Sequence, residues 1–160
     1  IMVLLIISSL LLFVAYMAYA LRAIKDIPWS ISDTYYQLEK RGRKKWPFQL
    51  AMIVPAMLLL PVWLECSNEN LQFLAFLSCG GLMFVGAAPC FKLELEGKIH
   101  YAATAICGIS AVLWVCLSEM WYIPLVAFIA AGILMYKYKK WMFWIECAAF
   151  VSTYISVMLA

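Results

Sequence analysis

A single carboxylate lies well inside an apolar stretch of the sequence, and it is the first residue that could do chemistry within a membrane. The helical face of Glu146 continues to Thr153, and Ser152 adds a further polar side chain to the same stretch. An ionisable residue at that depth is costly to bury and indicates a functional site, such as a transport pathway. The alternative is that Glu146 extends to the membrane surface and pairs with Lys139 or Lys140.

The chain has one histidine, His100, at the start of another apolar stretch. A single histidine excludes haem ligation by two histidines. Together with Asp33, His100 could form the acid–base pair of an enzyme, or the same hydrogen bond could pin a loop to the helix ends. His100 could also be a buried residue bonded to a loop carbonyl. No nucleophile arrangement accompanies the pair, so no residue is assigned as catalytic.

None of the six cysteines forms a C-x-x-C pair, and one histidine is too few for the common zinc sites. We therefore expect neither a metal nor a cofactor. Cys66 and Cys116 are both predicted near the outer membrane face. Two free thiols are favoured there, and a disulfide is the alternative if that side is oxidising.

Composition decides which elements position these residues. The chain has 160 residues, of which 67% are hydrophobic and 13% charged, about half the charged fraction of a soluble domain. These values exclude disorder and make a water-soluble fold untenable. Apolar stretches of the length a membrane helix needs predict an all-α, polytopic bundle, one domain over 1–160, with spans at about 1–21, 47–65, 71–91, 99–118, 121–136 and 141–160. The first is interpreted as a span and not as a signal peptide.

Charge predicts the orientation of this bundle. All 12 Lys and Arg residues lie in the connections between spans one and two, three and four, and five and six. The alternate connections have none and carry Glu69 and Glu119. The positive-inside rule places the basic loops in the cytoplasm and both termini on the other side, as in a bacterial inner membrane protein. The net charge of +3 is therefore a topology signal, and we expect no nucleic acid partner.

The first basic loop has structure signals of its own. Cap residues stand in a row at Ser32, Asp33 and Thr34, and Thr34 with Gln37 predicts a capping box. They predict a short interfacial helix that ends at Gly42. The basic cluster that follows suits anionic headgroups or serves as a topology anchor, which we favour; it comprises Lys40, Arg41, Arg43, Lys44 and Lys45.

Small residues predict where helices pack closely. Spacing by four residues places Ala103, Cys107 and Ala111 on one face, and Gly81 and Gly86 lie in a glycine-rich span. Aromatic residues near the predicted span ends match the aromatic belts of membrane proteins. We assign two aromatic belts: one interface carries Trp29, Trp46, Tyr101, Tyr136, Tyr138, Trp141 and Trp144, and the other carries Trp63, Trp114, Trp121 and Tyr122.

Two segments resemble the DRAM-like membrane family, which includes autophagy modulators, GPI-lipid remodelling proteins and bacterial six-span relatives of unknown function. Pro28-Trp29-Ser30-Ile31-Ser32-Asp33-Thr34 is similar to that family's serine-aspartate loop. Gly81-Leu82-Met83-Phe84-Val85-Gly86-Ala87-Ala88-Pro89, followed by His100-Tyr101-Ala102-Ala103-Thr104-Ala105, is similar to its third span and the start of its fourth. The resemblance implies a six-span fold, singles out Ser32, Asp33, Gly86 and His100, and supplies no reaction. The basic residues place the loop in the cytoplasm, whereas eukaryotic members have it on the other side.

These observations leave three functions open. The sequence favours a non-enzymatic bundle that interacts with membrane lipids, with a protein partner or with a second copy of the chain. A small transporter or channel would use Glu146 and His100, and a sheltered cavity that reaches Glu146 would favour it. An intramembrane lipid-modifying enzyme would use His100 and Asp33, and a lipid headgroup between them would favour it.

Overall fold

The computed structural model describes residues 1–90 and 93–160, and within them the chain is helical with no strand. The helices are α1 Met2–Ile24, α2 Asp33–Lys40, α3 Trp46–Cys66, α4 Gln72–Ala87, α5 Leu93–Val115, α6 Tyr122–Tyr138 and α7 Trp141–Leu159. Short 3-10 helices at Glu69–Leu71 and Ala88–Cys90 flank α4. An irregular turn over Cys116–Met120, with Glu119 at a φ of 64°, joins α5 to α6.

Five of these helical segments are long and apolar enough to cross a membrane, which is the pattern of a multi-pass membrane protein. They are Met2–Ile24, Trp46–Cys66, Glu69–Cys90, Glu96–Met120 and Trp141–Leu159. The helix at the predicted fifth span, α6, has 17 residues and is shorter than a usual span. The all-helical fold is thus confirmed, five segments have the length and composition of membrane spans, and the sixth crossing stays a prediction.

The helix ends differ from the prediction at one place that matters. Helix α5 begins at Leu93, six residues before the predicted start at Ile99, so His100 lies two turns inside a helix and does not open it. The charged residues before Ile99 hide this start from a hydropathy argument, because a helix can extend beyond the apolar region. The predicted end of the third span at Phe91 and the basic residue Lys92 lie outside the described residues.

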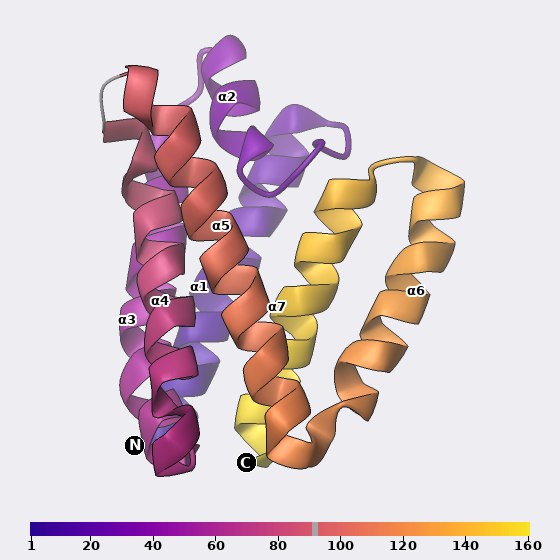
Figure 1. Cartoon of the computed structure of the whole chain (residues 1–160). Coiled ribbons are helices and arrows are strands. Elements are labelled where there is room, and N and C mark those ends of the chain that lie inside the picture. The colour runs from indigo at the N-terminus through magenta and orange to yellow at the C-terminus, as the bar shows by residue number, and fades with distance from the viewer. Residues whose placement is uncertain (91–92) are drawn as a thin grey trace.

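Consecutive long helices run in opposite directions (Figure 1). Helix α4 packs between α3 and α5, α1 packs on α3, and α6 packs chiefly on α7 at the edge of the molecule. Helix α2, the start of α5 and the connection between α6 and α7 lie at one end of the bundle, whereas both termini lie at the other. The alternation predicted from charge therefore matches the way the chain turns.

Glycines allow the closest helix contacts. A Cβ atom at Gly81 would lie 2.8 Å from the Ala103 carbonyl oxygen and 2.9 Å from the Cys107 nitrogen. On the other side of α4, a Cβ at Gly86 would lie 2.9 Å from side-chain atoms of Ile53 and of Met52. The two glycines thus bring α4 into contact with α5 and with α3.

Two tryptophans that we assigned to an aromatic belt lie in the core instead. Trp63 is 1% and Trp114 0% exposed, and their rings meet edge to face with centroids 5.3 Å apart. The Trp114 Nε1 donates to Ser67 Oγ at 2.8 Å. Position near a helix end does not distinguish a ring that faces lipid from one that faces a neighbouring helix, and here the neighbouring helix is the partner.

Candidate functional site

The loop between α1 and α3 folds back onto the bundle and forms one wall of the site. Thr34 does not cap α2 through its side chain; its Oγ1 donates to the Ile31 carbonyl at 2.5 Å and lies 2.5 Å from the Tyr16 hydroxyl. The predicted capping box is therefore wrong. Gln37 Nε2 instead donates to Asp33 Oδ2 at 3.4 Å. The predicted short helix is confirmed, and Gly42 follows it with a φ of 64°.

Two backbone contacts tie this loop to α7. The Phe143 N–H donates to the Trp29 carbonyl at 2.9 Å, and the Ile31 N–H donates to Glu146 Oε2 at 2.6 Å. Glu146 does not make the alternative pairing with Lys139 or Lys140, because within residues 1–90 and 93–160 the recorded ion pair is Lys45 with Glu39. Glu146 turns towards the loop because a backbone N–H within the bundle also needs an acceptor.

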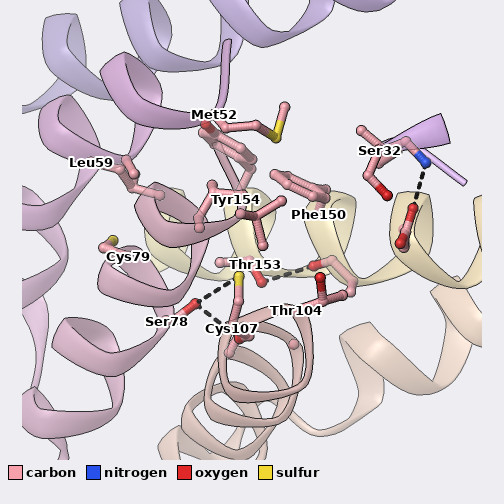
Figure 2. Close-up of a pocket in the computed structure, with 18 of the residues that line it drawn as sticks. Ser32, Met52, Leu59, Ser78, Cys79, Thr104, Cys107, Phe150, Thr153 and Tyr154 are labelled. Atoms are coloured by element: carbon pink, nitrogen blue, oxygen red, sulfur yellow. Dashed lines mark hydrogen bonds between the residues drawn. The ribbon is translucent and has the colours of Figure 1, made fainter. Parts of the chain in front are cut away.

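A cavity lies between α3, α4, α5 and α7, and Glu146 contributes to its lining. The loop residues Ile31 and Ser32 close one end. Figure 2 shows Ser32 at one end of the lining side chains, with Leu59 and Cys79 at the other. The space available to the centres of water-sized atoms is about 90 Å³, so an occupant several atoms long fits.

Most polar side chains on the cavity wall already have partners in the protein. Ser78 Oγ donates to the Cys107 carbonyl at 3.1 Å, and Thr153 Oγ1 donates to the Ala149 carbonyl at 2.8 Å, as Figure 2 shows. The Tyr154 hydroxyl lies 2.6 Å from Ser9 Oγ. The remaining lining is mainly apolar, so the wall suits a hydrocarbon with few polar groups.

Asp33 and His100 do not form the predicted hydrogen bond within the described residues. The Asp33 carboxylate accepts from the Trp29 N–H at 3.0 Å, which closes the turn before α2. His100 lies edge to face with Tyr101, with ring centroids 5.8 Å apart, and is not among the residues that line the cavity. A different side-chain contact joins α2, the helix of Asp33, to α5, the helix of His100.

Helix α2 meets α5 through Tyr36, whose hydroxyl donates to Glu96 Oε1 at 2.5 Å, one turn before His100. Partial burial, and then the Glu96 carboxylate, raise the pKa of Tyr36, so the phenol keeps its proton over the physiological range. The loop does fold over the start of α5, but a tyrosine makes the contact that we expected from Asp33.

The basic cluster lies at this end of the bundle, with four of its five side chains exposed. Lys45 is the exception: it binds the Glu39 carboxylate and lies 5.0 Å from the centroid of the Tyr35 ring. The hydrogen bond to Glu39 raises the pKa of Lys45 above its usual value. The exposed members are Lys40, Arg41, Arg43 and Lys44.

The six cysteines are free thiols, including Cys66 and Cys116. Among the residues that the structure describes, no group of three or more His, Cys, Asp or Glu side chains could hold a metal ion. The binding properties of the cavity therefore depend on Glu146 and on the uncharged groups around it.

Comparison with known proteins adds no family to this geometry. No family model, no curated protein and no solved structure matches the chain. The similarity to the DRAM-like family thus stays a prediction from two short segments. The sequence indicated Glu146 but not the cavity. Trp63, which lines it, was assigned to an aromatic belt, and Thr104 carried no signal beyond being a polar residue in an apolar helix.

Proposed function

We propose that this chain is a non-enzymatic membrane protein that holds an elongated, amine-bearing apolar molecule in the cavity between α3, α4, α5 and α7. The observation that carries the proposal is that Glu146, on a membrane-length helix, lines the cavity and has no ion-pair partner among the described residues. A carboxylate in such a place is stabilised by a cation, and a ligand amine supplies one. The apolar lining suits the hydrocarbon part of such a ligand.

Transport of this ligand is a second candidate, and the position of the loop favours it. Ile31 and Ser32 cover the cavity at the end of the bundle that carries α2, so displacement of the loop would open the cavity to water. His100 lies off the cavity wall, so a transport role rests on Glu146 alone. The enzymatic alternative has less support, since Asp33 bonds to Trp29 and Gln37.

The orientation in the membrane is part of the proposal. We place the basic loops in the cytoplasm and both termini outside, with α6 as a sixth crossing, in a bacterial inner membrane. This is supported by the gathering of the basic connections at the end of the bundle opposite the termini. The exposed basic cluster would then lie beside anionic headgroups, which makes membrane lipids the partners of this surface.

Labelling of single cysteines introduced on a cysteine-free background tests this orientation. Cysteines in Lys40–Lys45 and in Lys137–Lys140 should react with an impermeant reagent only from the cytoplasmic side. Cysteines at Asn68 and Glu119 should react only from the outside. Reaction of positions 44 and 68 from the same side would contradict the proposed topology.

Ligand binding is tested by filling the cavity. Gly108 lines it, and a Cβ there would meet nothing within 4 Å, so a leucine side chain can occupy the void without displacing a helix. Addition of hexylamine should raise the unfolding temperature of the wild-type protein in detergent, because a ligand that binds only the folded state stabilises it. Gly108→Leu should weaken this binding by about tenfold or more, equivalent to about 1.4 kcal/mol.

The matched control is Gly132→Leu on α6, where a Cβ would also meet nothing within 4 Å but which is not among the lining residues. It should bind hexylamine as the wild type does. Without ligand, Gly108→Leu should unfold at the wild-type temperature or above it, since it fills a void. Equal binding by both variants would show that the amine binds outside the cavity and would contradict the proposal.

A further inference from the structure

A groove opens on the surface of the bundle between α1 and α3, away from the cavity that Glu146 lines. Buried side chains form its floor, among them Tyr16 and Ala51, each 5% exposed. Leu12 and Leu50 stand at its rims, 46% and 50% exposed. The lining is almost wholly apolar, and the space for the centres of water-sized atoms is about 380 Å³. The groove therefore offers a concave apolar surface to the surroundings of the protein.

The floor of this groove is held in place by contacts with the protein interior. The Tyr16 hydroxyl lies 2.5 Å from Thr34 Oγ1, and the Tyr16 ring packs edge to face on Phe48 with centroids 6.1 Å apart. A groove that exists before its ligand arrives does not have to be ordered on binding, which favours affinity. The shape of the groove is thus a property of the folded chain.

The length and position of the groove match one leaflet of a bilayer. Its lining extends from Leu12 to Tyr19 on α1 and from Trp46 to Val54 on α3. At about 1.5 Å per residue this is roughly 10–12 Å, which fits within half of a hydrocarbon core about 30 Å thick. Helix α1 ends and α3 begins at the end of the bundle that carries α2 (Figure 1). The groove therefore runs from the membrane surface at that end towards the middle of the bilayer.

Two aromatic side chains line the surface end of the groove. Trp46 is 53% and Tyr19 39% exposed. Both have an apolar ring and a polar tip, which suits the depth at which lipid chains meet their headgroups. An acyl chain in the groove would thus have its ester end beside these two rings.

Basic residues come next to both aromatic residues. Arg22 follows Tyr19 by three residues, and residues three apart are neighbours on the surface of a helix. Lys44 precedes Trp46 by two residues, so their Cα atoms are at most about 7.6 Å apart. Arg43 comes immediately before Lys44, and all three basic residues are exposed. Positive charge from both helices therefore flanks the surface end of the groove.

No carboxylate of the described chain neutralises these three cations. The ion pair recorded within residues 1–90 and 93–160 joins Lys45 to Glu39, so Arg22, Arg43 and Lys44 have no carboxylate partner there. An anionic phospholipid headgroup supplies that charge at a membrane surface. A zwitterionic headgroup has no net charge to offer.

We propose that the groove between α1 and α3 binds one anionic phospholipid, with an acyl chain along the groove and the phosphate close to Arg22, Arg43 and Lys44. This rests on the proposed function only in that it places the basic connections at a membrane surface. A general attraction between the basic cluster and anionic lipid needs no groove, whereas this site holds a single lipid in a defined position.

Native mass spectrometry of the protein in a neutral detergent tests the role of charge, because it counts bound lipids. Dioleoylphosphatidylglycerol should bind as one tight adduct, more tightly than dioleoylphosphatidylcholine, which has the same chains. Arg43→Gln with Lys44→Gln should bind phosphatidylglycerol about 25-fold more weakly, about fivefold for each charge removed, and phosphatidylcholine as before. Lys137→Gln with Lys139→Gln is the control, since it removes two exposed charges at the same end of the bundle and should leave the affinity unchanged.

The role of the groove is tested by narrowing it. Val54 lines the groove and is partly exposed, so Val54→Trp should place an indole in the groove and weaken binding of both lipids by about tenfold or more. Met57→Trp is the matched control, because Met57 lies three residues further along α3, is 59% exposed and is not among the lining residues. It should bind both lipids as the wild type does.

Cross-linking locates the lipid in the wild-type protein without any substitution. Phosphatidylglycerol that carries a photoreactive diazirine in its acyl chain should label peptides that contain residues 12–19 and 46–54. Labelling spread evenly over the outer helices, with equal binding by Val54→Trp and Met57→Trp, would show annular lipid only and overturn the proposal.

Two further outcomes separate this proposal from the proposed function. A preference for phosphatidylglycerol that survives in Arg43→Gln with Lys44→Gln would overturn the assigned headgroup position while hexylamine binding and the orientation still stand. Reaction of positions 44 and 68 from the same side of the membrane would overturn the orientation, and with it the leaflet to which this lipid is assigned.

Discussion

Gly81→Leu is expected to yield little folded protein, because the substitution forces α4 and α5 apart. A Cβ at this position would approach the Ala103 carbonyl oxygen to 2.8 Å and the Cys107 nitrogen to 2.9 Å. Both are backbone atoms, so neither can rotate away. Overpacking alone costs about 1–3 kcal/mol, and in a bilayer it also removes the close contact that holds helices together. The measurement is the yield of monodisperse protein and its unfolding temperature in detergent.

The adjacent residue provides the control. A Cβ at Gly80 would meet nothing within 4 Å, so Gly80→Leu should behave as the wild type. Gly86→Leu should also be destabilised, because a Cβ there would lie 2.9 Å from the Met52 Cβ, which the backbone holds in place, and 3.3 Å from the Gln49 carbonyl oxygen. If Gly81→Leu were as stable as Gly80→Leu, α4 and α5 would not pack as described.

Glu146→Leu is expected to release the loop that covers the cavity. The carboxylate accepts from the Ile31 N–H at 2.6 Å, and leucine would leave that backbone donor without a partner. An unsatisfied buried donor costs about 1–3 kcal/mol, so the Ile31 amide should exchange its hydrogen about five- to 150-fold faster. Hydrogen exchange resolved to the segment 26–32 measures this directly.

Glu146→Gln is the matched variant, since its amide oxygen can still accept from Ile31. It should preserve most of the protection of the loop but lose the negative charge, and with it most of the affinity for an amine. Equal protection of the loop in the leucine and glutamine variants would show that the remaining bond, from the Phe143 N–H to the Trp29 carbonyl, suffices to hold it.

Hydropathy predicted the helices well because each apolar stretch must satisfy its own backbone hydrogen bonds within a membrane. The prediction failed at the start of α5, where charged residues such as Glu96 continue the helix beyond its apolar part. The assignment of Trp63 and Trp114 to an aromatic belt also failed, because the rule for aromatic belts considers depth in the membrane and not the direction that a ring faces.

The site was predictable only in part. Glu146 stands out in the sequence as a carboxylate among apolar residues, but its partner is the backbone N–H of Ile31, and a backbone donor leaves no mark in a sequence. The cavity was beyond prediction because its walls come from four helices and a loop, so it depends on how they are arranged in space.

The unequal lengths of the outer helices give the molecule a thick side and a thin side. Helix α1 has 23 residues and is roughly 34 Å long, whereas α6 has 17 residues and is roughly 25 Å long. The hydrocarbon core of a bilayer is about 30 Å thick, so α1 is longer than this thickness and α6 is shorter. With α6 as the sixth crossing that we propose, lipid chains must stretch or α1 must tilt at one flank, and the bilayer must thin at the other. Because α6 packs chiefly on α7, the adjustment falls on lipid there, and a thinner membrane relieves it. Hydrophobic mismatch thus makes bilayer thickness a variable to which the α6 flank responds first.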